Sequence, residues 1–390
     1  MATLFLSLIY LAFISLGLPD SMLGASWPAM REALSLPISG AGPIAMIITC
    51  GTVISSLASG KMLKRFGTGR VMIVSVSLTA AALLGIALAP SYIWLCFLAV
   101  PLGIGGGAVD AGLNNFVALH YKASHMSWLH CFWGFGATAG PIIMGGALSL
   151  TGKWQNGYLT VGIIQIAVVA LLFLSLPLWK KYEPVPPGAE KADHEKKLSP
   201  FKLPGAASAV SSFFFYCALE TATGLWAASY LVENKGLSSV TAAKWASVFY
   251  LGITVGRLVS GFVAMKISGK SLIFIGQSIC LCGAVLIALP LGNTFSAIGL
   301  AVVGLGCAPI YPSMIHETPR RFGAENSGAL IGFQMACAYM GNLIVPPLIG
   351  VLGTVTGLWV FPYVLIFCCG AMFVLAQITE KSIARAKSKH

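Results

Sequence analysis

The chain has 390 residues, of which 57% are hydrophobic and 9% are charged. This composition excludes a soluble domain folded around one core and indicates an integral membrane protein. The formal net charge of +12 does not predict nucleic-acid binding, because the basic residues are not clustered with aromatic or groove-reading partners.

Twelve apolar segments follow one another along the chain, and a membrane-spanning helix needs about 20 such residues. The first segment begins with uncharged residues and lacks both a basic start and a small-residue cleavage site, so we interpret it as a retained helix. The pattern predicts an all-α membrane protein. We expect spans at 3–28, 39–62, 69–90, 92–118, 124–150, 157–180, 204–232, 238–266, 270–290, 293–316, 325–353 and 357–380.

Three acidic residues lie inside these apolar spans: Asp20 in the first, Asp110 in the fourth and Glu220 in the seventh. A carboxylate in hydrocarbon costs at least a few kcal/mol, so each must be neutralised, paired or facing a watery cavity. These residues are therefore the first candidates for a functional site.

The first span is expected to break beside its acid. Pro19 removes a helix hydrogen bond just before Asp20, and Gly17 and Gly24 let the backbone bend. A half-broken helix with an acid at the break is typical of transport sites. The alternative is that Asp20 only caps or hydrogen-bonds a neighbouring helix.

Spans four and five carry further candidates. Because burial disfavours the charged form of a carboxyl group, Asp110 could hold a proton and release it when its cavity opens. Asn114 lies one turn further on the same helix face and could bind a solute hydroxyl, orient the carboxyl or bond another helix. His130 could relay protons or be an ordinary buried histidine, and Trp133 could stack on a solute or only pack.

The spans of the second half offer hydrogen-bonding and aromatic groups. Glu220 could accept from two hydroxyls of a solute or bind a second proton; the alternative is a structural ion pair with Arg257 or Lys244. The other candidates for substrate binding are Trp27, Trp226, Tyr230, Gln334, Tyr339 and Asn342, although aromatic residues are also ordinary core residues in membrane bundles.

The chain divides at its one long polar segment, which we predict to be a cytoplasmic linker over residues 181–203. Residues 1–180 and 204–390 then form two six-helix halves. Five residue identities recur at one offset of 201: Gly60 and Gly261, Gly103 and Gly304, Gly105 and Gly306, Phe132 and Phe333, Gly140 and Gly341. Two related halves predict a binding site between them near the midplane.

The basic residues predict the orientation in the membrane. Nineteen of the 24 Lys and Arg residues fall in alternate loops or the C-terminal tail. By the positive-inside rule both termini are then cytoplasmic, which requires an even number of spans. We expect a protein of the plasma membrane.

Cofactors and metals are not expected. All ten cysteines fall within or beside apolar spans without His or acid neighbours at metal-ligand spacing. The chain has no Gly-x-Ser-x-Gly string, no His-Glu-x-x-His string and no nucleotide-binding domain, so neither a hydrolytic enzyme nor an ATP-driven pump is predicted.

The sequence resembles the major facilitator superfamily in the loop after span two, where residues 60–70 read GKMLKRFGTGR. The resemblance assigns cytoplasmic gating to Arg65 and Arg70, and to Arg257 in a weaker second copy. The family usually has Asp where Lys64 stands, so the usual acidic contact of the gate is missing.

Within that superfamily the chain shows a closer resemblance to the fucose permease-like sugar:proton symporters. The matching strings are GLPD at 17–20, AVDAGLNN at 108–115, LHCFWGFGA at 129–137, YCALE at 216–220 and APIYP at 308–312. This resemblance implies that Asp20 and Asp110 are the protonatable pair.

We therefore expect a monomeric secondary transporter that couples protons, or alternatively sodium, to uptake of a monosaccharide or related polyhydroxy solute. One alternative is a proton-driven exporter of amphipathic drugs or lipids on the same fold. Another is a sugar-binding receptor that does not transport.

Overall fold

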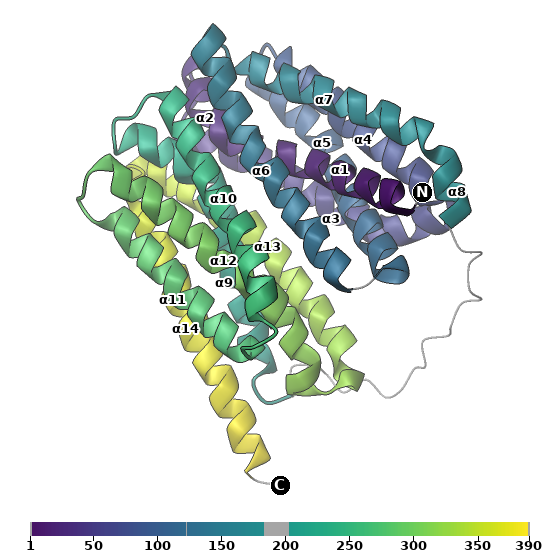
Figure 1. Ribbon diagram of the computed structural model, residues 1–390. Helices are drawn as coiled ribbons and strands as arrows, with labels where there is room; N and C mark the ends of the chain where they lie inside the picture. The colour runs from purple at the N-terminus through teal and green to yellow at the C-terminus, as the bar shows by residue number, and fades with distance from the viewer. Residues whose placement is uncertain (1, 122, 183–202, 389–390) are drawn as a thin grey trace.

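The computed structural model describes residues 2–121, 123–182 and 203–388 (Figure 1). Within them the regular structure consists of α-helices and one short 3-10 turn, with no strand. The first elements are α1 (Ala2–Asp20), α2 (Met22–Ala33), η1 (Ile38–Gly40), α3 (Ala41–Phe66), α4 (Thr68–Ala87), α5 (Tyr92–His120), α6 (Ala123–Thr151), α7 (Trp154–Leu174) and α8 (Leu176–Tyr182). They are followed by α9 (Ala206–Glu233), α10 (Ser239–Val263), α11 (Gly269–Ala288), α12 (Asn293–Phe322), α13 (Ala324–Thr356) and α14 (Val360–Lys387).

The helices confirm the prediction of an all-α membrane protein. Eleven segments of the described residues are long and apolar enough to cross a membrane, with α1 and α2 counted together as one. The remaining long helix, α9, has 28 residues and carries Glu220, Thr221 and Thr223 near its middle, which lower its hydropathy. With α9, the described residues contain a long helical segment for each of the twelve predicted spans, the first being α1 and α2 together.

The first span is broken where Pro19 and Asp20 predict it. α1 ends at Asp20 and α2 begins at Met22, with Ser21 between them. The two pieces touch different neighbours. A Cβ on Gly17 of α1 would lie 2.2 Å from the Trp133 carbonyl oxygen of α6, and one on Gly24 of α2 would lie 2.1 Å from the Gly224 carbonyl oxygen of α9.

The long helices gather into two groups, seen in Figure 1 as the purple-to-blue and the green-to-yellow helices. In the first group, α3 and α4 pack against α5, and α1 packs against α6. The second group repeats this arrangement, with α10 and α11 against α12, and α9 against α13. Of the predicted linker, residues 183–202 lie outside the described residues.

Two close helix contacts, one in each group, involve residues that are 201 positions apart in the sequence. A Cβ on Gly103 would lie 2.2 Å from the carbonyl oxygen of Ile48, and one on Gly304 would lie 2.0 Å from that of Phe249, which is 201 residues after Ile48. Both helix pairs therefore approach backbone to backbone in the same register, which only glycine permits at these positions.

The two groups meet along α6 and α10, and more locally where α2 packs on α9 and α3 on α13. At the end of the bundle where α2 and α9 finish, which we call the closed end, Arg31 forms an ion pair with Glu233. Nearby, the Ser39 amide donates to Thr354 Oγ1 at 3.0 Å. These contacts join the two groups at that end.

Candidate functional site

A cavity of about 1220 Å³ lies between the two helix groups and is lined by residues of both. It extends to the turn 264–268 between α10 and α11, where Lys266 is exposed. Toward the closed end its lining residues Met30, Leu95 and Tyr158 are buried. The cavity thus has its mouth at the end of the bundle opposite the Arg31–Glu233 pair.

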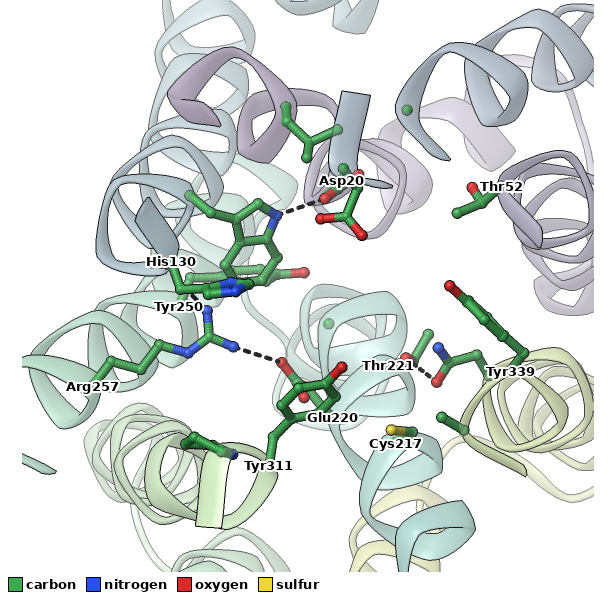
Figure 2. Close-up of a pocket in the computed structure, with 18 of the residues that line it drawn as sticks. Asp20, Thr52, His130, Cys217, Glu220, Thr221, Tyr250, Arg257, Tyr311 and Tyr339 are labelled. Carbon is green, nitrogen blue, oxygen red and sulfur yellow. Dashed lines mark hydrogen bonds and ion pairs between the residues drawn. The ribbon is translucent and has the colours of Figure 1, made fainter. Parts of the chain in front are cut away.

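The first helix group contributes two carboxyl groups to this cavity, Asp20 at the end of α1 and Asp110 in α5. Asp20 Oδ2 accepts from the indole Nε1 of Trp133 at 2.8 Å (Figure 2). Asp110 Oδ1 accepts from the amide Nδ2 of Asn114 at 2.8 Å. Neither carboxyl takes part in an ion pair within the described part of the chain.

The second helix group contributes an acid and a base. Glu220 Oε1 lies 3.9 Å from Arg257 Nη2, so the two charges attract without forming a close hydrogen bond. Arg257 also donates through Nη1 to the carbonyl oxygen of His130 at 3.3 Å. Its Cζ lies 5.0 Å from the ring centroid of Trp133, in a cation–π contact. The pair anticipated as an alternative for Glu220 therefore forms with Arg257, at the cavity wall.

Polar side chains continue the wall beside Glu220. Thr221 donates to Asn342 Oδ1 at 2.7 Å, and Tyr339 of α13 lies next to them (Figure 2). Tyr250 and Tyr311 of the second helix group also line the cavity.

Three of these cavity residues, Thr221, Tyr250 and Tyr311, were not among the sequence candidates. A signal existed for two of them, because Thr221 and Tyr311 lie 201 residues after Asp20 and Asp110. Tyr250 carried no comparable signal.

Several predicted residues lie elsewhere. Trp27 and Trp226 are fully buried and donate their indole N–H groups to the carbonyl oxygens of Ile38 and Pro346. The Tyr230 hydroxyl donates to the Ile287 carbonyl oxygen, and buried Gln334 accepts from Thr318. None of these four lines the cavity, and Asn114 reaches it only through Asp110.

The three arginines assigned to gating lie in two places. Arg65 and Arg70 are exposed around the turn between α3 and α4, where Arg65 lies over the ring of Phe66 at 5.3 Å. Arg257 lies in the central cavity. His130 also lines the cavity, and its ring meets Phe13 edge-on at 5.6 Å.

The described residues contain no group of three His, Cys, Asp or Glu side chains that could hold a metal ion. All ten cysteines are free thiols.

A helical membrane bundle with acidic side chains in a central cavity is typical of transport proteins, and the family comparison agrees. The family model described as the Major Facilitator Superfamily matches residues 9–290 and 208–387, so the chain belongs to this superfamily. The predictions of a membrane transporter of this superfamily, and not an enzyme, are confirmed.

The chain is similar to named transporters over nearly its whole length. It is 24% identical to the hexuronate transporter of Bacillus subtilis, covering 95% of this chain and 92% of the relative. It is 23% identical to the glucose/mannose transporter GlcP of Bacillus subtilis, covering 87% of this chain and 86% of the relative. Among solved structures, the fucose:proton symporter FucP of E. coli has a TM-score of 0.66 at 17% identity, covering 96% and 98% of the two chains.

Proposed function

We propose that this protein couples the entry of protons to the uptake of a monosaccharide or a similar small polyhydroxy solute. One observation carries the proposal: two carboxyl groups without a basic partner, Asp20 and Asp110, face the same cavity as a wall of hydrogen-bonding side chains. The names of the hexuronate, glucose/mannose and fucose:proton transporters agree with such a substrate.

The carboxyl groups of the first helix group serve as the proton sites. Asp110 has one amide donor and no cation within ion-pair distance, so its ionised form is poorly stabilised in a membrane interior. Binding a proton removes that cost, and a change of solvent access around the group then releases the proton. In this proposal Asp110 carries the proton and Asp20 couples it to the cargo, while His130, whose carbonyl oxygen accepts from Arg257, assists the proton transfer.

The second helix group holds the cargo. The 3.9 Å gap between Glu220 and Arg257 lets a sugar hydroxyl accept from the guanidinium while a neighbouring hydroxyl donates to the carboxylate. Thr221 and Asn342 offer further partners, and the ring of Tyr339 offers a face for the C–H surface of a sugar.

Transport follows by alternating access, with the two six-helix halves rocking about the cavity. The mouth lies at the end that carries the basic turns with Arg65 and Lys266, so the positive-inside rule places it on the cytoplasmic side, together with both termini. The proposed location is the plasma membrane. In this state the closed end, with Arg31 and Glu233, faces outward.

The proposal is tested with the purified protein in proteoliposomes. Exchange and accumulation are measured for a panel of labelled sugars that includes hexoses and hexuronates, and the pH and sodium gradients are set separately. Proton-coupled uptake predicts accumulation when the outside is more acidic than the inside, with or without sodium. Accumulation that follows only the sodium gradient would reassign the coupling ion, and saturable binding without any accumulation would favour a receptor.

The size of the cavity favours a second candidate, an exporter of amphipathic molecules. Its volume of about 1220 Å³ exceeds the roughly 300–1,000 Å³ of ordinary small-molecule sites. Apolar residues such as Phe13, Leu16 and Leu102 also line it. An exporter would tolerate Asn342→Ala, because a mostly apolar cargo does not need that amide, whereas sugar uptake would fall.

A further inference from the structure

The indole of Trp133 lines the cavity and contacts residues of both helix groups. On one side its Nε1 donates to Asp20 Oδ2 at 2.8 Å. On the other side the guanidinium of Arg257 lies over the indole ring in a cation–π contact, with Cζ 5.0 Å from the centroid. Arg257 in turn faces Glu220 at 3.9 Å. A continuous row of contacts therefore runs from a carboxyl of the first group to a carboxyl of the second.

The backbone of Trp133 is fixed to the first group. A Cβ on Gly17 would lie 2.2 Å from the Trp133 carbonyl oxygen, so α1 and α6 are in direct backbone contact just before Asp20. Arg257 and Tyr250, whose ring meets Trp133 at 6.4 Å, belong to α10 of the second group. The contact between the indole and the guanidinium is thus a contact between the two groups.

The two interactions of the indole reinforce each other. A carboxylate that accepts from Nε1–H makes the ring face more negative, and a more negative face holds a cation more strongly. When Asp20 is protonated, its hydrogen bond from the indole weakens, and the hold on Arg257 weakens with it. The guanidinium is then free to approach Glu220 or a bound hydroxyl.

We infer that Trp133 is a positioning residue through which the protonation of Asp20 sets the place of Arg257 and hence the readiness of Glu220 for cargo. This inference rests on the proposed proton-coupled uptake. It assigns to one side chain the link between proton and substrate, a role separate from holding either of them.

Other charged or titratable groups line the same cavity as Asp20. They include Asp110 on α5, His130 on α6, Tyr158 on α7, Glu220 on α9, and Tyr250 and Arg257 on α10. Of these residues, Tyr250 and Arg257 contact the Trp133 ring itself.

The proton link is measured first, without any substrate. Tryptophan fluorescence of the purified protein is recorded between pH 5 and pH 9 for the wild type and for Trp133→Phe, Asp20→Asn and Trp128→Phe. Trp128 is the matched control, since it lies on the same helix and is exposed. The expected result is a pH-dependent signal that persists in Trp128→Phe and disappears in the other two variants. A signal unchanged in Trp133→Phe, or absent from the wild type, would overturn the inference.

The substrate link is measured by transport. Phe keeps an aromatic face for Arg257 but has no N–H donor, so Trp133→Phe should exchange sugar within about threefold of the wild type and accumulate at least tenfold less. The pH at half-maximal accumulation should move upward, because a carboxyl that loses a donor keeps its proton more readily. Arg257→Lys keeps the charge but loses the planar stacking, and should give the same loss of accumulation.

The outcomes separate the inference from the proposed function. If wild-type liposomes accumulate no labelled sugar, the proposed function fails, while the fluorescence titration still decides the link between Asp20 and Trp133. If the wild type accumulates sugar and Trp133→Phe matches Trp128→Phe in accumulation and pH profile, the inference alone fails. Loss of exchange with an unchanged pH profile would make Trp133 a direct substrate contact and would also overturn it.

Discussion

Asn114 donates twice to Asp110, to the side-chain Oδ1 at 2.8 Å and to the backbone carbonyl oxygen at 3.0 Å. Both bonds go to one neighbour a single turn away. We therefore propose that Asn114 orients the Asp110 carboxyl. This is one of the three roles open to it from sequence.

Replacing Asp110 by Asn should separate exchange from accumulation. The amide resembles a carboxylic acid in shape but cannot release a proton, so sugar exchange persists while accumulation driven by a pH gradient is lost. Parallel exchange and accumulation assays in proteoliposomes check this. The control Asn114→Ala keeps the carboxyl and should retain accumulation in part. A pH response of Asp110→Asn equal to that of the wild type would remove Asp110 from the mechanism.

Replacing Glu220 by Gln should weaken sugar binding. A hydrogen bond to a charged group contributes about 1.5–3 kcal/mol, so the half-saturation concentration for exchange should rise about tenfold or more. The matched control is Lys244→Gln, because Lys244 packs beside Gly145 and does not line the cavity. An equal effect of both variants would show that the loss is not specific to Glu220 and would contradict a direct sugar contact.

Trp226→Phe should lower stability without changing sugar affinity. The indole donates to the Pro346 carbonyl oxygen at 2.7 Å in a fully buried place, and losing the donor leaves that oxygen unsatisfied at a cost of about 1–3 kcal/mol. Thermal unfolding in detergent should show the loss, while the half-saturation concentration stays constant. A change in affinity at unchanged stability would instead bring Trp226 into the binding site.

Gly103→Ala should destabilise the first helix group. Its Cβ would meet the Ile48 carbonyl oxygen at 2.2 Å, and such overpacking costs about 1–3 kcal/mol. Gly60 is the internal control, since a Cβ there meets nothing within 4 Å and alanine favours a helix over glycine. Comparison of the two melting temperatures tests the close contact directly, and equal values would contradict it.

Reversing the charge of Arg31 should open the closed end. Glu at this position would repel Glu233 of α9, and a partly exposed pair contributes about 0.2–1 kcal/mol, enough for up to about fivefold in population. Distances between spin labels on non-natural amino acids at positions 32 and 235 should lengthen. The double variant Arg31→Glu, Glu233→Arg restores the attraction and should return the wild-type distance. If the distance stays long, the ion pair does not hold the closed end together.

The sequence predicted the helices because hydropathy and length alone decide which segments span a membrane. It also predicted the break beside Asp20, because proline acts locally. The sequence also predicted that the three acids would face a cavity or a charged partner, because a carboxylate in contact with lipid is costly. Asp20, Asp110 and Glu220 all line the cavity.

The aromatic candidates of α9 could not be assigned to the cavity from the sequence. Trp226 lies six residues beyond Glu220, which turns it about 120° away around the helix. Which side of α9 faces the cavity depends on α13 and α14, whose packing the local sequence does not encode. The carbonyl partners of Trp226 and Tyr230, at Pro346 and Ile287, come from segments far along the chain.

The break at Ser21 divides the opening span into two pieces with different attachments. The first piece, α1, contacts α6 closely at Gly17, whereas the second piece, α2, contacts α9 closely at Gly24. In the proposed rocking motion, a bend at Ser21 would let α2 move with the second helix group while α1 stays with the first. The boundary between the two moving bodies would then run through the first span, about 160 residues before the proposed linker at the middle of the chain.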